Sequence, residues 1–193
     1  YRYNYQRNNK NQEIFKLRSE ALNAFREFLH NDGFIEMSTP ILNKSTPEGA
    51  RDFLVPSRIN NGNFYALPQS PQIYKQLLMV SGFDKYYQVA TCFRDEDLRS
   101  NRQPEFIQID IEMSFVDETD IKNKMELLIK HVFNSTLNLN IVDKFIELGY
   151  DECMEKYGTD KPDLRFDMEI IDVKHDFINS EFLMFKECIE NNL

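Results

Sequence analysis

The sequence predicts an α+β fold in which an antiparallel sheet is flanked by helices, and three local patterns support this prediction. Apolar residues recur at steps of three and four from residue 11 to 30, which is the spacing of an amphipathic helix. Apolar and polar residues alternate from 105 to 115, as in a strand with one face on a core. Ser70 followed by Pro71 is a typical helix start, since serine caps free N–H groups and proline needs none in the first turn.

The other elements follow from the same two periodicities and from the turn residues between them. Glycine after a helical run predicts its end, because glycine readily takes the left-handed conformation found there. Short apolar runs bounded by glycine, proline or polar residues predict strands, mostly joined locally and with helices packed on one side. In order we expect a helix over 11–30, a strand over 34–37, a loop over 44–51, a strand over 64–67, a helix from 70 to about 80, strands over 86–94 and 105–115, a helix over 120–133, and a tail of mixed helix and strand.

Charge and cysteine content restrict the classes of function. The net charge of −9 argues against a globally basic nucleic-acid-binding surface, so any RNA contact must be local. No apolar run approaches the roughly 20 residues that span a bilayer, and no membrane partner is expected. Cys92, Cys153 and Cys188 are widely spaced, which favours reduced buried thiols over a disulfide framework or a zinc site. The chain opens at Tyr1, so we interpret it as part of a longer protein.

Two short motifs carry ionic groups at the ends of predicted elements. Arg94 and Glu96 end a strand, where the guanidinium suits a phosphate and the carboxylate suits an exocyclic amine. A solvated surface ion pair is the alternative. Gln72 and Lys75 share a face at the start of a helix, whose N-terminus favours an anionic or zwitterionic ligand. A polar surface helix is the alternative there.

Two further features could contribute to a cleft. Residues 45–53 form a polar loop around Pro47-Glu48-Gly49, and such a loop can place a carboxylate over a site and move aside. The polar face of the 105–115 strand contains Gln108, Asp110 and Glu112, which would be solvated on most strands but could here line a cleft.

Taken together, these segments resemble the bacterial-type aspartyl-tRNA synthetases, a family of class II aminoacyl-tRNA synthetases. Residues 34–40, FIEMSTP, resemble motif 1 of this class, and residues 93–96, FRDE, resemble motif 2. The agreement of many segments in order is far more specific than any one of them. The resemblance implies a class II catalytic domain that is incomplete here, because motif 3 is absent. The longer matching stretches are residues 45–58, 65–99, 102–115 and 157–166.

The resemblance implies a ligase that uses ATP to convert L-aspartate to aspartyl-adenylate and then transfers the aspartyl group to the 3′ end of tRNA(Asp). Arg94 would be the catalytic residue, binding the α-phosphate and the substrate carboxylate. Arg99 and Arg102 would contact the tRNA acceptor end. The implied ATP-binding residues are Arg94, Glu96, Gln103 and Phe106. The implied aspartate-binding residues are Glu48, Ser70, Gln72, Lys75, Arg94, Gln108 and Asp110.

Further implications concern the parts of the enzyme and its assembly. Residues 1–165 would be the first half of the catalytic domain and residues 166–193 the start of the bacterial-type insertion domain. The ligands of Mg²⁺ would lie in the absent C-terminal part, with none in this chain, which is expected to be inactive alone. Motif 1 implies a homodimer. The location would be cytoplasmic, or an organelle (apicoplast, mitochondrion or plastid) in a eukaryote.

Other functions remain open at this point. Asparaginyl- and lysyl-type enzymes share motif 2 and the fold, but a lysine in the amino-acid pocket suits an acidic substrate and repels a cationic one. A non-discriminating enzyme would also charge tRNA(Asn). A synthetase-like binding or regulatory protein without catalysis is an alternative of another class, which the joint presence of Arg94, Glu96, Gln72 and Lys75 disfavours.

Overall fold

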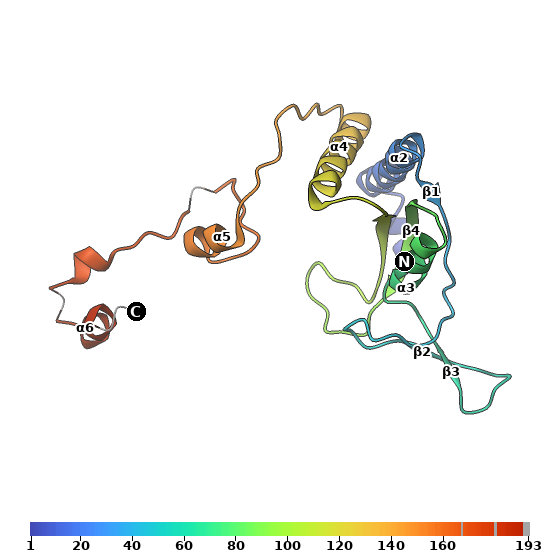
Figure 1. The fold of residues 1–193 in the computed structure, drawn as a ribbon, viewed down its shortest axis with the longest axis horizontal. Helices are drawn as coiled ribbons and strands as arrows, with labels where there is room; N and C mark the ends of the chain where they lie inside the picture. Colours follow the sequence, from blue (N-terminus) through green and yellow to red (C-terminus); the bar gives the residue numbers. More distant parts are fainter. Residues whose placement is uncertain (167, 180, 191–193) are drawn as a thin grey trace. The chain divides into compact units, whose positions relative to one another are not determined.

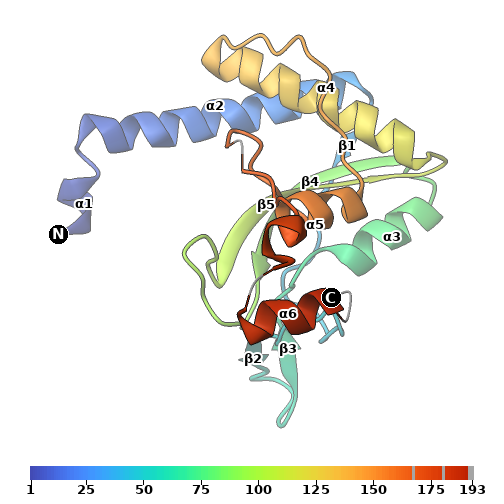
Figure 2. The same cartoon turned by 90° about the vertical axis from the view of Figure 1, so that its left-hand side faces the viewer.

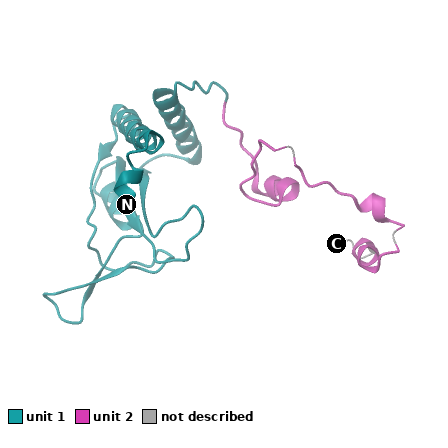
Figure 3. Cartoon of the chain, turned by 180° about the vertical axis from the view of Figure 1, so that it is seen from behind, with its two compact units in different colours: residues 1–143 teal, residues 144–193 magenta. Residues whose placement is uncertain are grey.

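The computed structural model describes residues 1–166, 168–179 and 181–190, which fall into two compact units, Tyr1–Asp143 and Lys144–Leu193 (Figure 3). The predicted insertion-domain segment, 166–193, includes residues 167, 180 and 191–193, which lie outside the described residues. The domain boundary at residue 165 stays a prediction.

The first unit contains every predicted helix and strand, with ends shifted by a few residues (Figure 1). Two short elements, α1 and β2, were not predicted. The elements are α1 (Arg2–Tyr5), α2 (Asn9–Asn31), β1 (Ile35–Glu36), β2 (Leu54–Pro56), β3 (Phe64–Ala66), α3 (Gln72–Val80), β4 (Lys85–Phe93), β5 (Glu105–Met113) and α4 (Glu118–Leu137).

The main sheet has the strand order β1-β4-β5. β4 and β5 are antiparallel from Lys85↔Met113 to Phe93↔Glu105, as the alternating pattern predicts. β1 runs parallel to β4, with Ile35 opposite Tyr86, so the prediction of an antiparallel sheet is wrong for this pair. The long connection through β2, β3 and α3 acts as the crossover that a parallel pair needs. β2 and β3 form a separate antiparallel pair.

The two faces of the main sheet have different coverings. The apolar face packs against α2 and α4, while α3 lies on the opposite side (Figure 2). The prediction that the helices pack on one side is therefore wrong for α3. That helix covers the polar face, which positions the site described below. The buried cluster on the apolar face comprises Ala24, Leu29, Phe34, Tyr87, Leu128 and Val132.

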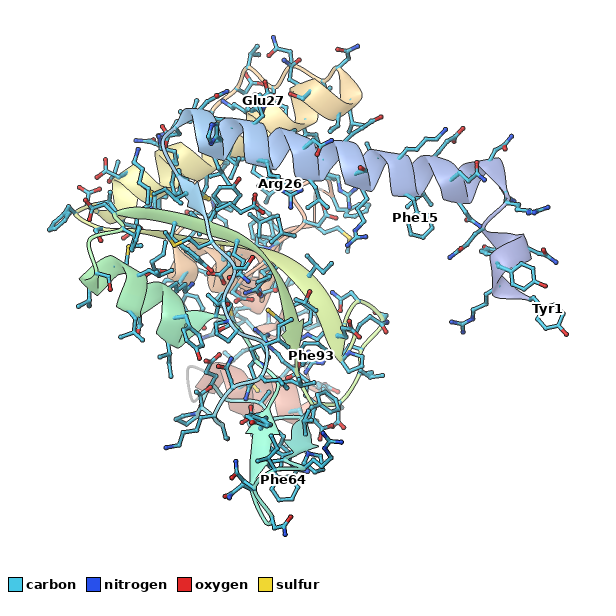
Figure 4. The ribbon with its side chains drawn as sticks, turned by 90° about the vertical axis from the view of Figure 1, so that its right-hand side faces the viewer. Tyr1, Phe15, Arg26, Glu27, Phe64 and Phe93 are labelled. Atoms are coloured by element: carbon cyan, nitrogen blue, oxygen red, sulfur yellow. The ribbon has the colours of Figure 1, made fainter. Side chains whose placement is uncertain are left out.

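Only the second half of α2 is buried, although its apolar periodicity predicts one continuous inner face. Ala24 and Leu29 lie in the core, but Ile14 and Leu17 are exposed. Figure 4 shows Phe15 on the part of α2 that extends beyond the sheet. Within the first unit this part of the apolar stripe is exposed, and exposed apolar surface of this kind suits contact with a partner.

The second unit contains α5 (Tyr150–Tyr157), a 3₁₀ helix, η1 (Lys174–Phe177), and α6 (Leu183–Glu190). None of its described residues forms a strand, so the predicted mixture of helix and strand is wrong in that respect. Cys153 is buried on α5, whereas Cys188 is exposed, contrary to the prediction of buried thiols. Over the parts of the chain that the structure describes, no helix is long and apolar enough to span a bilayer.

Candidate active site

An ionic cluster forms where α3 crosses the polar face of the β4–β5 pair. The Lys75 Nζ lies 2.9 Å from Oδ1 of Asp110 and 3.2 Å from Oε2 of Glu112. Burial by itself lowers the pKa of Lys75, but its contacts with Asp110 and then Glu112 outweigh burial and raise that pKa. Since the Lys75 side chain is only 12% exposed, the strand face holds a nearly buried ammonium that stays charged.

The two carboxylate oxygens of Asp110 have different contacts inside this cluster. Its Oδ2 accepts a 2.7 Å hydrogen bond from the Gln108 amide. Its Oδ1 is buried and accepts no well-aligned hydrogen bond, so the 2.9 Å contact with Lys75 is an ion pair of poor hydrogen-bond geometry. A buried carboxylate oxygen in this state can accept from the ammonium group of a ligand.

The predicted loop brings Glu48 to the start of α3. The Ser70 hydroxyl donates to Oε2 of Glu48 at 2.7 Å, and the Thr46 hydroxyl donates to Oε1 at 3.1 Å. α3 begins at Gln72, with Pro71 as its N-cap, two residues later than the predicted start at residue 70; the Gln72 N–H lies 3.3 Å from the Ser70 oxygen. A cavity of about 390 Å³ lies between the loop and the helix, within the size range of small-molecule sites. Its lining includes Ser45, Thr46, Glu48, Ser70, Ile73 and Tyr74.

A second cavity, of about 340 Å³, lies at the end of β4. The Arg94 guanidinium lies 5.0 Å from the centre of the Phe106 ring, so a phosphate-binding fork and an aromatic surface are held together. Arg102 is 3.6 Å from Glu96 in a partly exposed ion pair. Arg99 is exposed in the loop before β5. The residues that line this cavity are Arg94, Glu96, Asn101, Arg102, Gln103 and Phe106.

A buried thiol lies among the charged side chains of the site. Burial and the charge of Asp110 raise the pKa of Cys92 to about 11, so its thiol stays neutral. The charges of Arg94, Glu48 and Lys75 also act on this pKa. Charged residues from the loop, α3 and both long strands therefore lie near Cys92, whereas the cavity between the loop and α3 is lined by Glu48 and Ser70 and not by Lys75 or Asp110.

Three residues of the site were not assigned a role from the sequence. Glu112 is the second partner of Lys75. Its position on the polar face of the alternating strand could have predicted this contact. Cys92 is buried near the end of β4, and its position two residues before Arg94 in the predicted strand was a usable signal. Gln69 bonds to the loop around Ala50, and nothing in the sequence relates residues that far apart.

A sheet that carries an ionic cluster beside an Arg94–Phe106 cavity suits the catalytic domain of a class II tRNA synthetase, and the comparison with protein families shows this class. The family described as tRNA synthetases class II (D, K and N) matches residues 1–184, so the chain belongs to this family. The chain is 53% identical over 192 residues to the aspartate–tRNA ligase of Staphylococcus haemolyticus, covering 100% of this chain and 33% of that protein. It is 56% identical over 190 residues to the aspartate–tRNA(Asp/Asn) ligase of a Hydrogenobaculum species, covering 98% and 32%.

The solved structures show a related fold. Asparaginyl-tRNA synthetase from Pyrococcus horikoshii, complexed with asparaginyl-adenylate, superposes with a TM-score of 0.64 at 30% identity. The match covers 72% of this chain and 32% of that one. The chain thus spans about a third of the length of the relatives it matches.

Proposed function

We propose that this chain supplies the first half of the active site of an aspartate–tRNA ligase. The observation that carries the proposal is the nearly buried Lys75 ammonium beside Asp110, against a sheet whose strand β4 ends directly before Arg94. Identities above 50% to aspartate–tRNA ligases support it. The reaction would join L-aspartate to ATP as aspartyl-adenylate and then transfer the aspartyl group to the 3′ end of tRNA(Asp).

In this proposal the amino-acid pocket recognises both ends of aspartate. The side-chain carboxylate of the substrate pairs with Lys75 in place of Asp110 and Glu112. The ammonium group of the substrate binds Oδ1 of Asp110, beside Gln108. Glu48 and Ser70 close the pocket from the loop, and Gln72 lies at the same helix start. Lysine would be repelled by Lys75, and asparagine would lose a charge-assisted bond.

The nucleotide would lie in the cavity at the end of β4. Arg94 is placed to bind the α-phosphate and the attacking carboxylate, and Phe106 to stack on adenine. Glu96 would accept from the adenine amino group after releasing Arg102, with Gln103 at the rim. The substrate carboxylate is itself the nucleophile, so the residues contribute positioning and charge stabilisation. The asparaginyl-adenylate complex of the related structure supports a ligand of this kind.

We propose that two components of the enzyme, the Mg²⁺ ligands and the rest of the ATP pocket, lie outside this chain. The described residues contain no cluster of three or more histidine, cysteine, aspartate or glutamate side chains suited to a metal, so no step is assigned to Mg²⁺ here. The chain spans about a third of its relatives, and we propose that the other half of the ATP pocket lies elsewhere in the enzyme. The 193-residue chain alone should then show no adenylate synthesis, and measurable synthesis would contradict this part of the proposal.

The tRNA and a second subunit are the proposed macromolecular partners. Arg99 and Arg102 place two exposed cations on the loop between β4 and β5, a local basic feature on an acidic protein. Ile35 on the edge strand β1 and Phe15 on α2 are exposed and suit a homodimer interface. Sedimentation of the chain would test the homodimer: a monomer at micromolar concentration contradicts it.

Loss of Arg99 should weaken transfer to tRNA without affecting adenylate formation. Unchanged transfer would contradict the contact assigned to Arg99.

The main test is amino-acid-dependent ATP–pyrophosphate exchange. It is measured on a full-length protein, which contains this chain and is as long as the relatives. Aspartate, asparagine and lysine are compared. Exchange with aspartate alone supports the proposal and the role of Lys75. A folded protein that exchanges with none of them would favour the synthetase-like binding protein.

The 56% identity to an aspartate–tRNA(Asp/Asn) ligase favours a second candidate, a non-discriminating enzyme. It would use the same amino-acid pocket and differ only in tRNA choice. Charging purified tRNA(Asn) with aspartate tests it: product formation establishes the broader enzyme, and its absence with active tRNA(Asp) charging removes it.

A further inference from the structure

The side chain next to Ser70 is buried and holds the base of the loop that carries Glu48. Gln69 is 2% exposed. Its amide nitrogen donates to the Ala50 carbonyl at 2.8 Å and to Oδ1 of Asp52 at 2.6 Å. Its amide oxygen accepts from the Ala50 N–H at 3.0 Å. One side chain thus satisfies both backbone groups of Ala50, as a neighbouring strand would.

The same part of the loop is bonded from its other side as well. The carbonyl of Arg51 accepts from the Asp95 N–H at 3.1 Å, directly after Arg94. The Phe53 carbonyl accepts from the Leu67 N–H at 2.9 Å. Residues 50–53 are therefore fixed between the start of α3 and the end of β4, where the two proposed pockets lie.

The tip of the loop is held more weakly. Asn43 pairs with Ala66 through two backbone bonds, of 2.9 and 2.7 Å, so residues 44–49 lie between two fixed points. Their bonds to the fixed residues come from side chains, namely Glu48 to Ser70 and Ser45 to Asp52. Gly49, which adjoins Ala50, has φ +104°, a conformation that favours glycine. A pivot at Gly49 would let the tip move without the base.

We propose that Gln69 is a positioning residue that fixes the base of this loop, so that only residues 44–49 move when Glu48 closes over the amino-acid pocket. Gln69 itself touches no substrate. It acts by limiting the positions of Glu48 relative to Ser70, and it thereby sets the affinity for the amino acid. This inference rests on the proposed activation of aspartate.

The deciding variant is Gln69→Glu, which keeps the size of the side chain and its acceptor for Ala50. Its carboxylate cannot donate to the Ala50 carbonyl and faces the Asp52 carboxylate at the former 2.6 Å contact. In the 193-residue chain, hydrogen exchange of the amides in residues 44–52 should become about tenfold faster, while β4 and β5 keep their protection. In the full-length protein, KM for aspartate should rise about tenfold with kcat nearly unchanged.

Two further variants separate this bond from a general loss of structure. Adding Asp52→Asn to Gln69→Glu restores a donor and an acceptor in reversed positions, so it should recover much of the protection and of the KM. Gln76→Glu makes the same chemical change at an exposed position on α3 and should alter neither measurement.

Different results would contradict the role of Gln69 and the proposed function. Wild-type exchange in residues 44–52 of Gln69→Glu, faster exchange across the whole sheet, or no recovery in the double variant would each overturn the inference. If the unsubstituted protein activates no aspartate, the proposed function fails, and the exchange measurement still decides whether Gln69 fixes the loop.

Discussion

Replacement of Arg94 should slow catalysis and leave the stability of the fold unchanged. Its guanidinium lines the proposed nucleotide cavity and contacts the face of Phe106, while its backbone N–H bonds to Pro104 at 2.8 Å and holds the strand end. Arg94→Ala should therefore leave the fold intact and slow adenylate formation by roughly 10²–10³-fold, the cost of losing one preorganised donor. ATP–pyrophosphate exchange by the full-length protein and circular dichroism measure the two effects. Arg58→Ala, exposed on the β2–β3 hairpin, is the control, and near-normal exchange by Arg94→Ala would refute the assignment.

Lys75 should matter for stability as well as for substrate choice. Lys75→Met leaves Asp110 and Glu112 without their cation, and removing one partner of such a buried group costs about 3 kcal/mol. The raised pKa of Lys75 means that its stabilisation is fully present below the unfolded-state value of about 10.4 and is lost as the pH rises through the folded-state value.

Urea unfolding from pH 7 to pH 11 measures this difference between the wild type and Lys75→Met. The gap in free energy of unfolding should be constant to about pH 10 and shrink above it. Lys122→Met, which removes an exposed ion pair with Glu118, should change stability by less than about 0.5 kcal/mol. Equal effects at the two lysines would contradict the buried cluster.

Local sequence patterns point to charged candidate residues such as Arg94 and Lys75, but not to a residue such as Gln69 that positions a neighbouring loop. Arg94 and Lys75 stand at predicted element ends, where local pattern fixes their direction. The contact of Gln69 with Ala50 depends on how β3, the loop and β4 come together. Such a contact is a property of tertiary packing, so no local periodicity contains it.

At the scale of elements, the same division applies to the sheet. The alternation from 105 to 115 predicts β5 and its two faces, because strand side chains alternate. The pairing of β1 with β4 was predicted wrongly, since strand direction depends on the path of the connection between them. The short strand β2 is fixed mainly by its partner β3, and its three residues are too few to show a period.

The end of α2 is tied to two other elements by one residue, Asp32. Oδ1 of Asp32 is 2.7 Å from the Lys124 ammonium on α4, and its backbone carbonyl accepts from Lys85 on β4 at 2.7 Å. Burial by itself raises the pKa of Asp32, but Lys124 and then Lys85 outweigh burial and lower that pKa. Asp32 thus links the helix layer to the sheet.

Asp32→Asn should lower the free energy of unfolding at pH 7 by about 1 kcal/mol, as for a partly exposed ion pair. A lowered folded-state pKa contributes stability above the unfolded-state value of about 3.9, and this is lost as the pH falls through the folded-state value. The gap between Asp32→Asn and the wild type should therefore begin to shrink below about pH 4 in urea titrations. A gap as wide at pH 3 as at pH 7, or an equal effect of Asp97→Asn at an exposed position, would contradict the ionic link.

At the scale of the whole chain, the apolar core is concentrated in the first unit. Of the described apolar residues that are buried, only Cys153 lies beyond Asp143. The second unit instead exposes many apolar side chains, including Ile171 at 76% and Met168 at 80%. A segment of that size with so little burial falls below what a stable core needs.

We therefore expect residues 1–143 alone to unfold cooperatively, with a free energy within about 1 kcal/mol of the main transition of the whole chain. Residues 144–193 alone should show no cooperative transition, because Cys153 is the single buried apolar residue among their described positions. Urea titrations of the two pieces and the whole chain, followed by circular dichroism, make the comparison. A first piece that is unfolded in water, or a second piece with a sharp transition of its own, would show that the stabilising contacts are distributed differently.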